Sequence, residues 1–347
     1  MILTDIEKRE YDRYFSYYDF RKELENKTFL ITGAKGIIGK ALLKWLLYYN
    51  QLYKTNIKIL ASTRNENDIP DYIEKNDNVE FCKFNSEVEY VKDRNVDCII
   101  HMASSTSNKF FKSNPVEATR VILEPSIKLL ELAKEKDSSF IYLSSEEVYG
   151  QTDTEEPIDE NYVGRIDSLN TRSCYPLGKK LVELLCVSYA NEYNVDTKIL
   201  RPSVINGLTT KYDEERVDNE ILRCILENRN LILKSKGETK KCMVYTLDVI
   251  SALFIILLKG EKGNAYNVSN PDTFMSIYDR ANYLFDKFNK NCKVEIAEED
   301  TSINAGFLPK RQLKHNVDKL MKLGWKERTS LDNIYGIDVE RLKNNYN

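Results

Sequence analysis

Length, composition and charge limit what this chain can be. Its 347 residues are 42% hydrophobic and 30% charged, enough to bury a large core beneath a solvated surface. The 51 basic and 54 acidic residues leave a net charge of −3 without a basic stripe, which argues against nucleic acid as a partner.

The first two thirds of the chain carry an alternating strand and helix pattern. Residues 1–26, rich in Tyr, Glu, Lys and Arg, are predicted to form a helical extension outside the main fold. Predicted strands then cover residues 28–32, 57–62, 79–84, 98–103, 139–144 and 197–202, and predicted helices cover residues 38–49, 116–136 and 175–193. This order predicts an α/β domain over residues 27–202, with a doubly wound parallel sheet covered on both faces.

The pattern loosens after Arg201. A polar loop over residues 206–220 precedes a helical segment at 221–229 and a strand at 231–235, and a second helix at 247–258 precedes a strand at 265–270. These elements predict a smaller α+β lobe over residues 203–347, either separate from the first domain or interwoven with it.

Cysteine and histidine usage argues against a metal centre or a disulfide framework. The seven cysteines are scattered without a Cys-x-x-Cys pair, and His101 and His315 lie far apart. Reduced thiols in a cytoplasmic protein are therefore expected. The charged start of the chain is unlike a signal peptide. The longest apolar run, Ala252–Leu258, is too short to cross a bilayer, so no membrane partner is expected.

A glycine-rich turn follows the first predicted strand and opens a helix. Gly33, Gly36 and Gly39 allow the tight turn, a close approach of the backbone to a pyrophosphate, and packing of the helix on the strand. The helix N-terminus then presents backbone N–H groups and a positive dipole to the phosphates. The turn predicts an NAD or NADP site with contacts from Gly33, Lys35, Gly36, Ile37, Ile38 and Gly39.

The choice between the two cofactors depends on the end of the second predicted strand. No Asp or Glu stands there to bind the ribose 2′-hydroxyl of NAD, and Arg64 follows the strand instead. Arg64 is therefore either a ligand of the NADP 2′-phosphate or a solvated loop cation, and we leave both interpretations open.

A serine, a tyrosine and a lysine form the predicted catalytic set. Ser145 follows the fifth predicted strand, and Tyr175 and Lys179 stand four residues apart on one helix face. The Lys179 ammonium is expected to lower the pKa of the Tyr175 phenol, which makes a base for a sugar hydroxyl. Ser145 would hydrogen-bond the same oxygen as it becomes a carbonyl.

These motifs together resemble the extended short-chain dehydrogenases/reductases, the NAD-dependent epimerase/dehydratase family, over residues 27–330. The resemblance implies a Rossmann-type N-terminal domain and a C-terminal lobe that binds a nucleotide sugar. It adds Met102, Ala103 and Pro202 to the cofactor contacts, alongside Tyr175 and Lys179. It also implies a homodimer formed by the two long helices, and a default role in surface-polysaccharide synthesis.

Within the family, the segment around Arg172 is most similar to UDP-glucuronate decarboxylases. The segment that carries Glu146 and Glu147 is also similar to dTDP-glucose 4,6-dehydratases, where an acidic pair serves as acid and base around C5 and C6. In the decarboxylases only the position of Glu147 is acidic, so Glu146 is either catalytic or a solvated carboxylate. The resemblance places Ser145, Arg172 and Lys241 at the substrate, with Lys241 in place of a phosphate-binding arginine.

Three functions follow from this resemblance. The first is a 4,6-dehydratase or decarboxylase that works through a 4-keto sugar. The second is a 4-epimerase or 4-reductase, and the third is a cofactor-binding regulator without catalysis. The intact set of Ser145, Tyr175 and Lys179 argues against the third.

Overall fold

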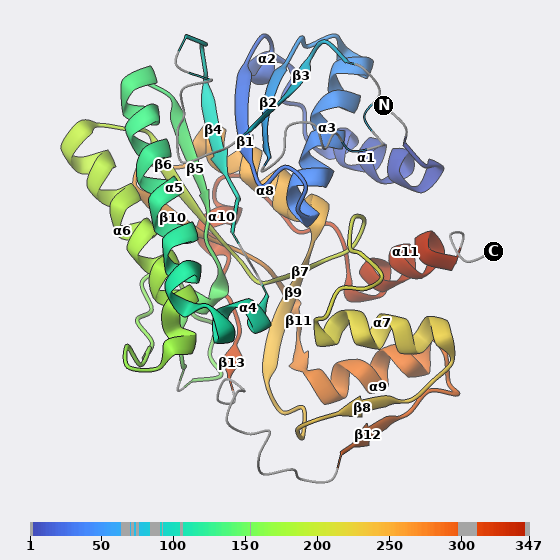
Figure 1. The fold of residues 1–347 in the computed structure, drawn as a ribbon. Coiled ribbons are helices and arrows are strands. Elements are labelled where there is room, and N and C mark those ends of the chain that lie inside the picture. The colour runs from blue at the N-terminus through green and yellow to red at the C-terminus, as the bar shows by residue number, and fades with distance from the viewer. Residues whose placement is uncertain are drawn as a thin grey trace.

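The computed structural model describes residues 3–63, 70, 73, 76–83, 91, 93–104, 107–152, 154–297 and 311–343. Its centre is a seven-stranded sheet in which every neighbouring pair is parallel, in the order β10-β6-β5-β4-β1-β2-β3 (Figure 1). The strands are β1 (Thr28–Thr32), β2 (Lys58–Thr63), β3 (Val79–Lys83), β4 (Cys98–His101), β5 (Ser139–Leu143), β6 (Thr197–Pro202) and β10 (Asn264–Val268). The strand order reverses between β1 and β4, the position at which such sheets bind ligands beyond the carboxyl ends of their strands.

Helices cover both faces of this sheet, which confirms the predicted Rossmann-type α/β fold. One face holds α3 (Ile37–Tyr53) and α8 (Thr246–Lys259), and the other holds α4 (Asn108–Ser113), α5 (Pro115–Lys136) and α6 (Cys174–Tyr193) (Figure 1). Successive side chains of a strand point to opposite faces. Accordingly, Phe29 and Ile31 belong to the core beneath α3 and α8, and Leu30 belongs to the core beneath α5 and α6.

The remaining elements form a smaller lobe beside the carboxyl ends of the strands. Its main sheet places β9 (Lys240–Tyr245) between β11 (Asn270–Ser276) and β13 (Gln312–Leu313), with β7 (Val204–Asn206) also paired to β9. A second pair joins β8 (Leu231–Leu233) to β12 (Val294–Ile296). Its helices are α7 (Val217–Glu227), α9 (Ile277–Phe288) and α11 (Leu331–Lys343), whereas α10 (Asp318–Met321) packs on β10 of the main sheet.

The two parts of the chain are interwoven. Helix α8 packs on α3, and β10 pairs in parallel with β6 at the edge of the main sheet, although both elements follow residue 203 in the sequence. The sequence alone shows that α8 is a long apolar helix and that β10 is a buried strand. It does not show that they pack on α3 and β6. None of the helices within the described ranges is long and apolar enough to cross a membrane.

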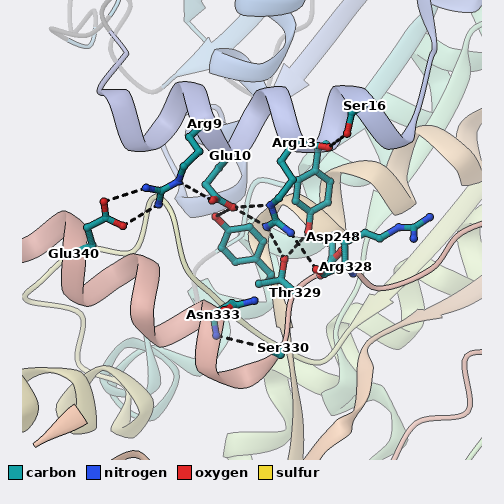
Figure 2. Close-up of polar contacts among 12 residues, drawn as sticks. Arg9, Glu10, Arg13, Ser16, Asp248, Arg328, Thr329, Ser330, Asn333 and Glu340 are labelled. Atoms are coloured by element: carbon teal, nitrogen blue, oxygen red, sulfur yellow. Dashed lines mark hydrogen bonds and ion pairs between the residues drawn. The ribbon is translucent and has the colours of Figure 1, made fainter. Parts of the chain in front are cut away.

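The N-terminal segment contains α1 (Asp5–Tyr17) and α2 (Arg21–Leu24) and packs onto the main fold. Figure 2 shows how α1 is tied to the C-terminal part of the chain. Arg9 bonds to Glu340 of α11 at 2.8 and 3.1 Å, and Arg13 bridges Glu10 at 2.6 Å and Thr329 at 2.9 Å. The extension is therefore helical, as predicted, but it lies against the main fold, because its apolar side chains share that core.

A buried ion pair holds the smaller lobe together and gives a stability prediction. Arg280 of α9, 1% exposed, bonds to Asp218 of α7 at 2.6 Å and donates to the Lys241 carbonyl at 2.6 Å. Removing one partner leaves an uncompensated buried charge, so Asp218→Ala is expected to lower the free energy of unfolding by about 3–5 kcal/mol. Chemical denaturation measures it.

The matched control is Lys287→Ala on the same helix α9. Lys287 pairs with Asp332 at 2.7 Å, but its side chain is half exposed, so the pair is screened by water. Loss of the Lys287–Asp332 pair should change the denaturation midpoint much less than Asp218→Ala does. Equal effects of the two substitutions would contradict the importance of the buried pair.

Candidate active site

The glycine-rich turn connects β1 to α3 at the carboxyl end of the sheet. Gly33 has a φ of +72°, and a Cβ there would lie 2.9 Å from the Ala103 nitrogen, while a Cβ at Gly39 would lie 2.2 Å from the Gly33 carbonyl oxygen. Gly36 is the N-cap of α3, with no side-chain cap and no acidic residue in the first turn. The turn therefore suits a phosphate that is bound by backbone N–H groups.

The residues of this turn that are predicted to contact the cofactor differ in how exposed they are. Lys35 and Gly36 are exposed, Ile37 is half-buried, and the Ile38 side chain lies in the core. Any contact from Ile38 to a cofactor would thus come from its backbone. Arg64 lies outside the described residues, so its assignment stays a prediction.

A hydrogen-bonded chain joins the turn to the end of β4. The Thr32 hydroxyl accepts bonds from the backbone nitrogens of Met102 and Ala103, at 3.2 and 3.1 Å, and lies 2.7 Å from Nδ1 of His101. Nε2 of His101 lies 2.9 Å from the Ser126 hydroxyl of α5. Burial lowers the pKa of His101 to about 3, so the ring is neutral and links β1, β4 and α5. Met102 and Ala103 thus lie beside the glycine-rich turn, and their contacts with a cofactor stay a prediction.

Ser145, Tyr175 and Lys179 come together beyond β5. Tyr175 is buried and stacks on Phe111 of α4, with ring centroids 4.7 Å apart. Lys179 donates to the Leu143 carbonyl at the end of β5, at 2.7 Å, and its Nζ lies 5.9 Å from the centroid of the Tyr175 ring. The Tyr175 phenol also interacts with the Ser145 hydroxyl. Ser145 at the end of β5 therefore lies beside Tyr175 and Lys179 of α6, and the catalytic roles of the three residues stay a prediction.

The protonation states of this trio differ from the prediction. Burial raises the pKa of the Tyr175 phenol, Glu147 adds to the effect, and the Ser145 hydroxyl opposes it. Burial also lowers the pKa of the Lys179 amine to about 7. The pKa of Tyr175 is therefore raised overall, where a lowered value was expected, and Lys179 is itself desolvated and bonds to the strand. The effect of Lys179 on Tyr175 stays a prediction.

Glu147 lies between two arginines. Its Oε1 accepts a bond from Nη2 of Arg172 at 3.2 Å, and its Oε2 lies 4.0 Å from Nη2 of Arg311. Arg172 precedes α6 in the short 3₁₀ turn Thr171–Ser173 and also donates to Asn108 of α4, at 2.8 Å. Glu147 is thus held beside the catalytic trio and keeps a positively charged neighbour.

Glu146 has a different set of neighbours. It is 5% exposed, with Oε1 3.5 Å from Nζ of Lys241 and Oε2 4.0 Å from Nε2 of His315. Burial raises the pKa of Glu146, while Lys241 and Arg311 oppose this shift. The interpretation of Glu146 as a solvated carboxylate is therefore wrong.

The chain leaves the extended conformation directly after β5. It forms a 3₁₀ turn over Glu146–Tyr149, with Ser145 as its N-cap and the Ser145 hydroxyl accepting from the Glu147 nitrogen at 3.2 Å. The alternation of side chains along a strand therefore does not apply to Glu146 and Glu147. Ser145 can cap because its short side chain reaches the backbone of the turn.

Several residues of the site were not predicted. Arg311 and His315 come from the distant β13 region, and Phe111 and Asn108 come from α4. The Ser145–Tyr175–Lys179 spacing carried no signal for any of them. Pro202 ends β6, where it pairs with Val268 of β10. Its role at the cofactor stays a prediction.

The fold and the site together define a dinucleotide-dependent enzyme of the short-chain dehydrogenase/reductase type. The model of the NAD dependent epimerase/dehydratase family matches residues 29–269. The chain belongs to this family, and the prediction of an enzyme that uses NAD or NADP is confirmed.

Individual relatives are distant in sequence, and some of them match most of the chain. UDP-glucuronic acid decarboxylase 6 of Arabidopsis thaliana is 24% identical over 316 residues, which are 88% of this chain and 86% of that protein. An epimerase of Methanothermobacter thermautotrophicus superimposes with a TM-score of 0.78 at 19% identity, over 96% and 97% of the two chains. The dTDP-glucose 4,6-dehydratase of Bacillus anthracis, solved with NAD, gives 0.74 at 20% identity, over 92% and 97%.

Proposed function

We propose that this chain modifies a nucleotide-linked sugar through a 4-keto intermediate and acts on carbon 5 or 6, as a 4,6-dehydratase or a decarboxylase. The observation that carries the proposal is the position of Glu146 and Glu147, which lie directly beside the Ser145–Tyr175–Lys179 trio and face Arg172, Lys241 and Arg311. A 4-epimerase needs no carboxylate pair at this point. The decarboxylase relatives support the same class.

The cofactor fits the residues that the structure provides. A Cβ at Gly33 would collide with the backbone of Ala103, and a Cβ at Gly39 would collide with the Gly33 carbonyl oxygen, so glycines keep this turn tight. The N-terminus of α3, which has no side-chain cap, can offer backbone N–H groups to a pyrophosphate. When bound, NAD or NADP would supply the acceptor for the C4 hydride, and its positive charge would favour ionisation of the Tyr175 phenol.

Different side chains would then carry out the separate proton transfers. Tyr175 removes the proton of the C4 hydroxyl while Ser145 hydrogen-bonds the same oxygen, which leaves a ketone. The ketone acidifies the C5 proton, or makes a C6 carboxylate a labile β-keto acid. Glu147 would remove the C5 proton or orient the substrate for loss of carbon dioxide. Arg172 and Lys241 would hold negative charge of the substrate.

Product analysis tests this function directly. The purified protein is incubated with UDP-glucuronic acid, UDP-glucose or dTDP-glucose, and the products are analysed by mass spectrometry. Loss of water indicates a dehydratase and loss of carbon dioxide a decarboxylase. An epimer of unchanged mass would support the 4-epimerase, and no product with bound cofactor would support the non-catalytic regulator.

Arg64 decides between the two cofactors. If it binds the 2′-phosphate, Arg64→Ala loses a charged hydrogen bond of about 1.5–3 kcal/mol, which weakens NADP by roughly 10- to 150-fold and spares NAD. Isothermal titration calorimetry with both cofactors measures the difference. Equal small changes would make Arg64 a loop cation and favour NAD.

The two long helices support a homodimer. Helices α5 and α6 pack side by side on the outer face of the sheet. They expose apolar side chains that include Val116, at 70% exposed, and Leu184, at 60%. Leu184→Glu is expected to convert the dimer to monomers, because a buried unpaired charge is costly. Light scattering would show it, whereas Ile232→Glu in the smaller lobe should leave the dimer intact. A monomeric parent protein would refute the dimer.

The chemistry of the cysteines supports the proposed cytoplasmic location. All seven are free thiols in the structure, and six of them are buried. Such thiols persist in a reducing compartment.

A further inference from the structure

Buried polar atoms without hydrogen-bond partners gather around the two glutamates. Among the described residues they include Oε2 of Glu146, Oε2 of Glu147, Nη1 of Arg172, Nη1 of Arg311 and both ring nitrogens of His315. A buried polar atom without a partner costs free energy, so such a cluster marks a place where a partner arrives or a proton is shared. The proposed substrate accounts for the arginines, but it leaves His315 without a role.

His315 is held rigidly behind Glu146. It lies on an extended segment that forms a parallel bridge with Ile158, where the Ile158 nitrogen donates to the Lys314 carbonyl and the Asn316 nitrogen donates to the Ile158 carbonyl, both at 2.8 Å. The side chain is 0% exposed, and its Nε2 lies 4.0 Å from Oε2 of Glu146.

The charges around the pair determine its protonation. Glu146 faces Lys241 of β9, Arg311 before β13 and its neighbour Glu147. Burial lowers the pKa of His315 to about 3, and the charges of Lys241 and Arg201 act in the same direction. The aromatic ring of Tyr149 lies on another side of the imidazole, 5.9 Å between centroids. His315 is therefore neutral, and a neutral imidazole offers one nitrogen as an acceptor.

We propose that His315 is the positioning residue of Glu146: its neutral imidazole accepts a hydrogen bond from the protonated carboxyl group and keeps Glu146 available as a proton donor. A contraction of about 1 Å from the observed separation gives an ordinary hydrogen bond. The second oxygen of Glu146 then accepts from Lys241. This inference rests on the proposed function. It assigns the control of the acid Glu146 to His315, a residue outside the catalytic trio.

The different neighbours of Glu146 and Glu147 give these two adjacent carboxyl groups different roles in proton transfer. Glu147 pairs with Arg172 and would accept a proton, whereas Glu146, with its Oε2 4.0 Å from Nε2 of His315, would give one. In a dehydration, Glu147 would take the C5 proton, the C5–H electron pair would form the C5–C6 double bond, and the C6–O bond would break as the hydroxyl takes the Glu146 proton and leaves as water. The hydride removed from C4 would then return to C6, and the proton held by Glu147 would return to C5. The Glu146 carboxylate that remains faces Lys241 and regains a proton from water after product release.

The first test measures the protonation of Glu146 without any substrate. Infrared spectra of the whole protein are titrated with pH, and the band of the protonated carboxyl group is assigned by its loss in Glu146→Gln. Loss of the acceptor in His315→Leu should require about a 2- to 10-fold higher proton concentration to protonate Glu146. His315→Gln keeps an acceptor oxygen and should titrate near the parent. An unchanged midpoint in His315→Leu would overturn the proposal.

The second test is a double-mutant cycle on turnover. His315→Leu should slow the step after the first hydride transfer by about tenfold, with little change in KM, and it should have no further effect in the Glu146→Gln background. Additive losses would show a merely structural role and overturn the proposal. Lys314→Gln is the matched control, because this neighbouring side chain points away toward Phe274.

The two proposals fail in different ways. If the product proves to be an epimer, the proposed function is wrong, and the infrared titration still decides the His315–Glu146 contact. If the product shows loss of water or carbon dioxide while the titration midpoint is unchanged, only the role of His315 is wrong. Thermal unfolding of each variant verifies that it is folded before either result is used.

Discussion

Replacing Tyr175 with Phe is expected to lower turnover by about 10²–10⁴-fold while the fold and cofactor binding persist. The phenol hydroxyl is the only atom group removed, and the ring keeps its stacking on Phe111 of α4. Steady-state kinetics on the true substrate measure the loss. Calorimetric titration with the cofactor shows that the binding site is intact.

The control for this substitution lies on the same helix. Tyr193→Phe removes a hydroxyl from a side chain that is 43% exposed at the end of α6, and it should leave kcat unchanged. If Tyr175→Phe kept the parent rate, the base would be another residue. The trio of Ser145, Tyr175 and Lys179 would then be a packing motif.

The pH dependence of the first step follows from the same environment. Burial raises the pKa of the Tyr175 phenol, so the protonated form dominates near neutral pH in the protein alone. A rate that depends on the phenolate should therefore rise with pH until the cofactor-bound phenol is ionised. The sequence could place Tyr175 beside Lys179, but it could not show that Lys179 bonds to the Leu143 carbonyl and loses part of its charge.

Local patterns predicted the main sheet well for a physical reason. Strands such as β1 and β5 are short apolar runs buried on both faces, and the helices between them are long enough to show their period. The smaller lobe was harder, because β7, β8, β12 and β13 have only two or three residues each and gain their stability from distant partners.

The candidate site likewise contains some residues that the sequence could identify and others that it could not. Ser145, Glu147 and Tyr175 could be found because each follows a strand end or a fixed helical spacing. Arg311 and His315 could not, since nothing near them in the sequence indicates that β13 runs beside β9 and brings them to the glutamates. Whether a side chain meets its partner across more than a hundred residues is decided by topology.

The assignment of C5 or C6 chemistry depends most on Glu147, and Glu147→Gln is expected to separate the two halves of the reaction. The amide keeps the size of the side chain and an oxygen that can accept from Arg172, but it cannot take up a proton. Oxidation at C4 depends on Tyr175 and should proceed. The following step should stop, so reduced cofactor and a 4-keto sugar accumulate, visible as the absorbance of the dihydronicotinamide.

The control is Glu156→Gln, an exposed carboxylate in the loop between the 3₁₀ turn and α6, which should behave as the parent. A 4-epimerase does not depend on Glu147 in this way, because its ketone only needs to turn within the site and be reduced on the other face. If the protein were a 4-epimerase, Glu147→Gln would form the epimer at the parent rate, and reduced cofactor would not accumulate. That outcome would refute the dehydratase or decarboxylase, since a carboxylate held at 3.2 Å from Arg172 would then serve binding alone.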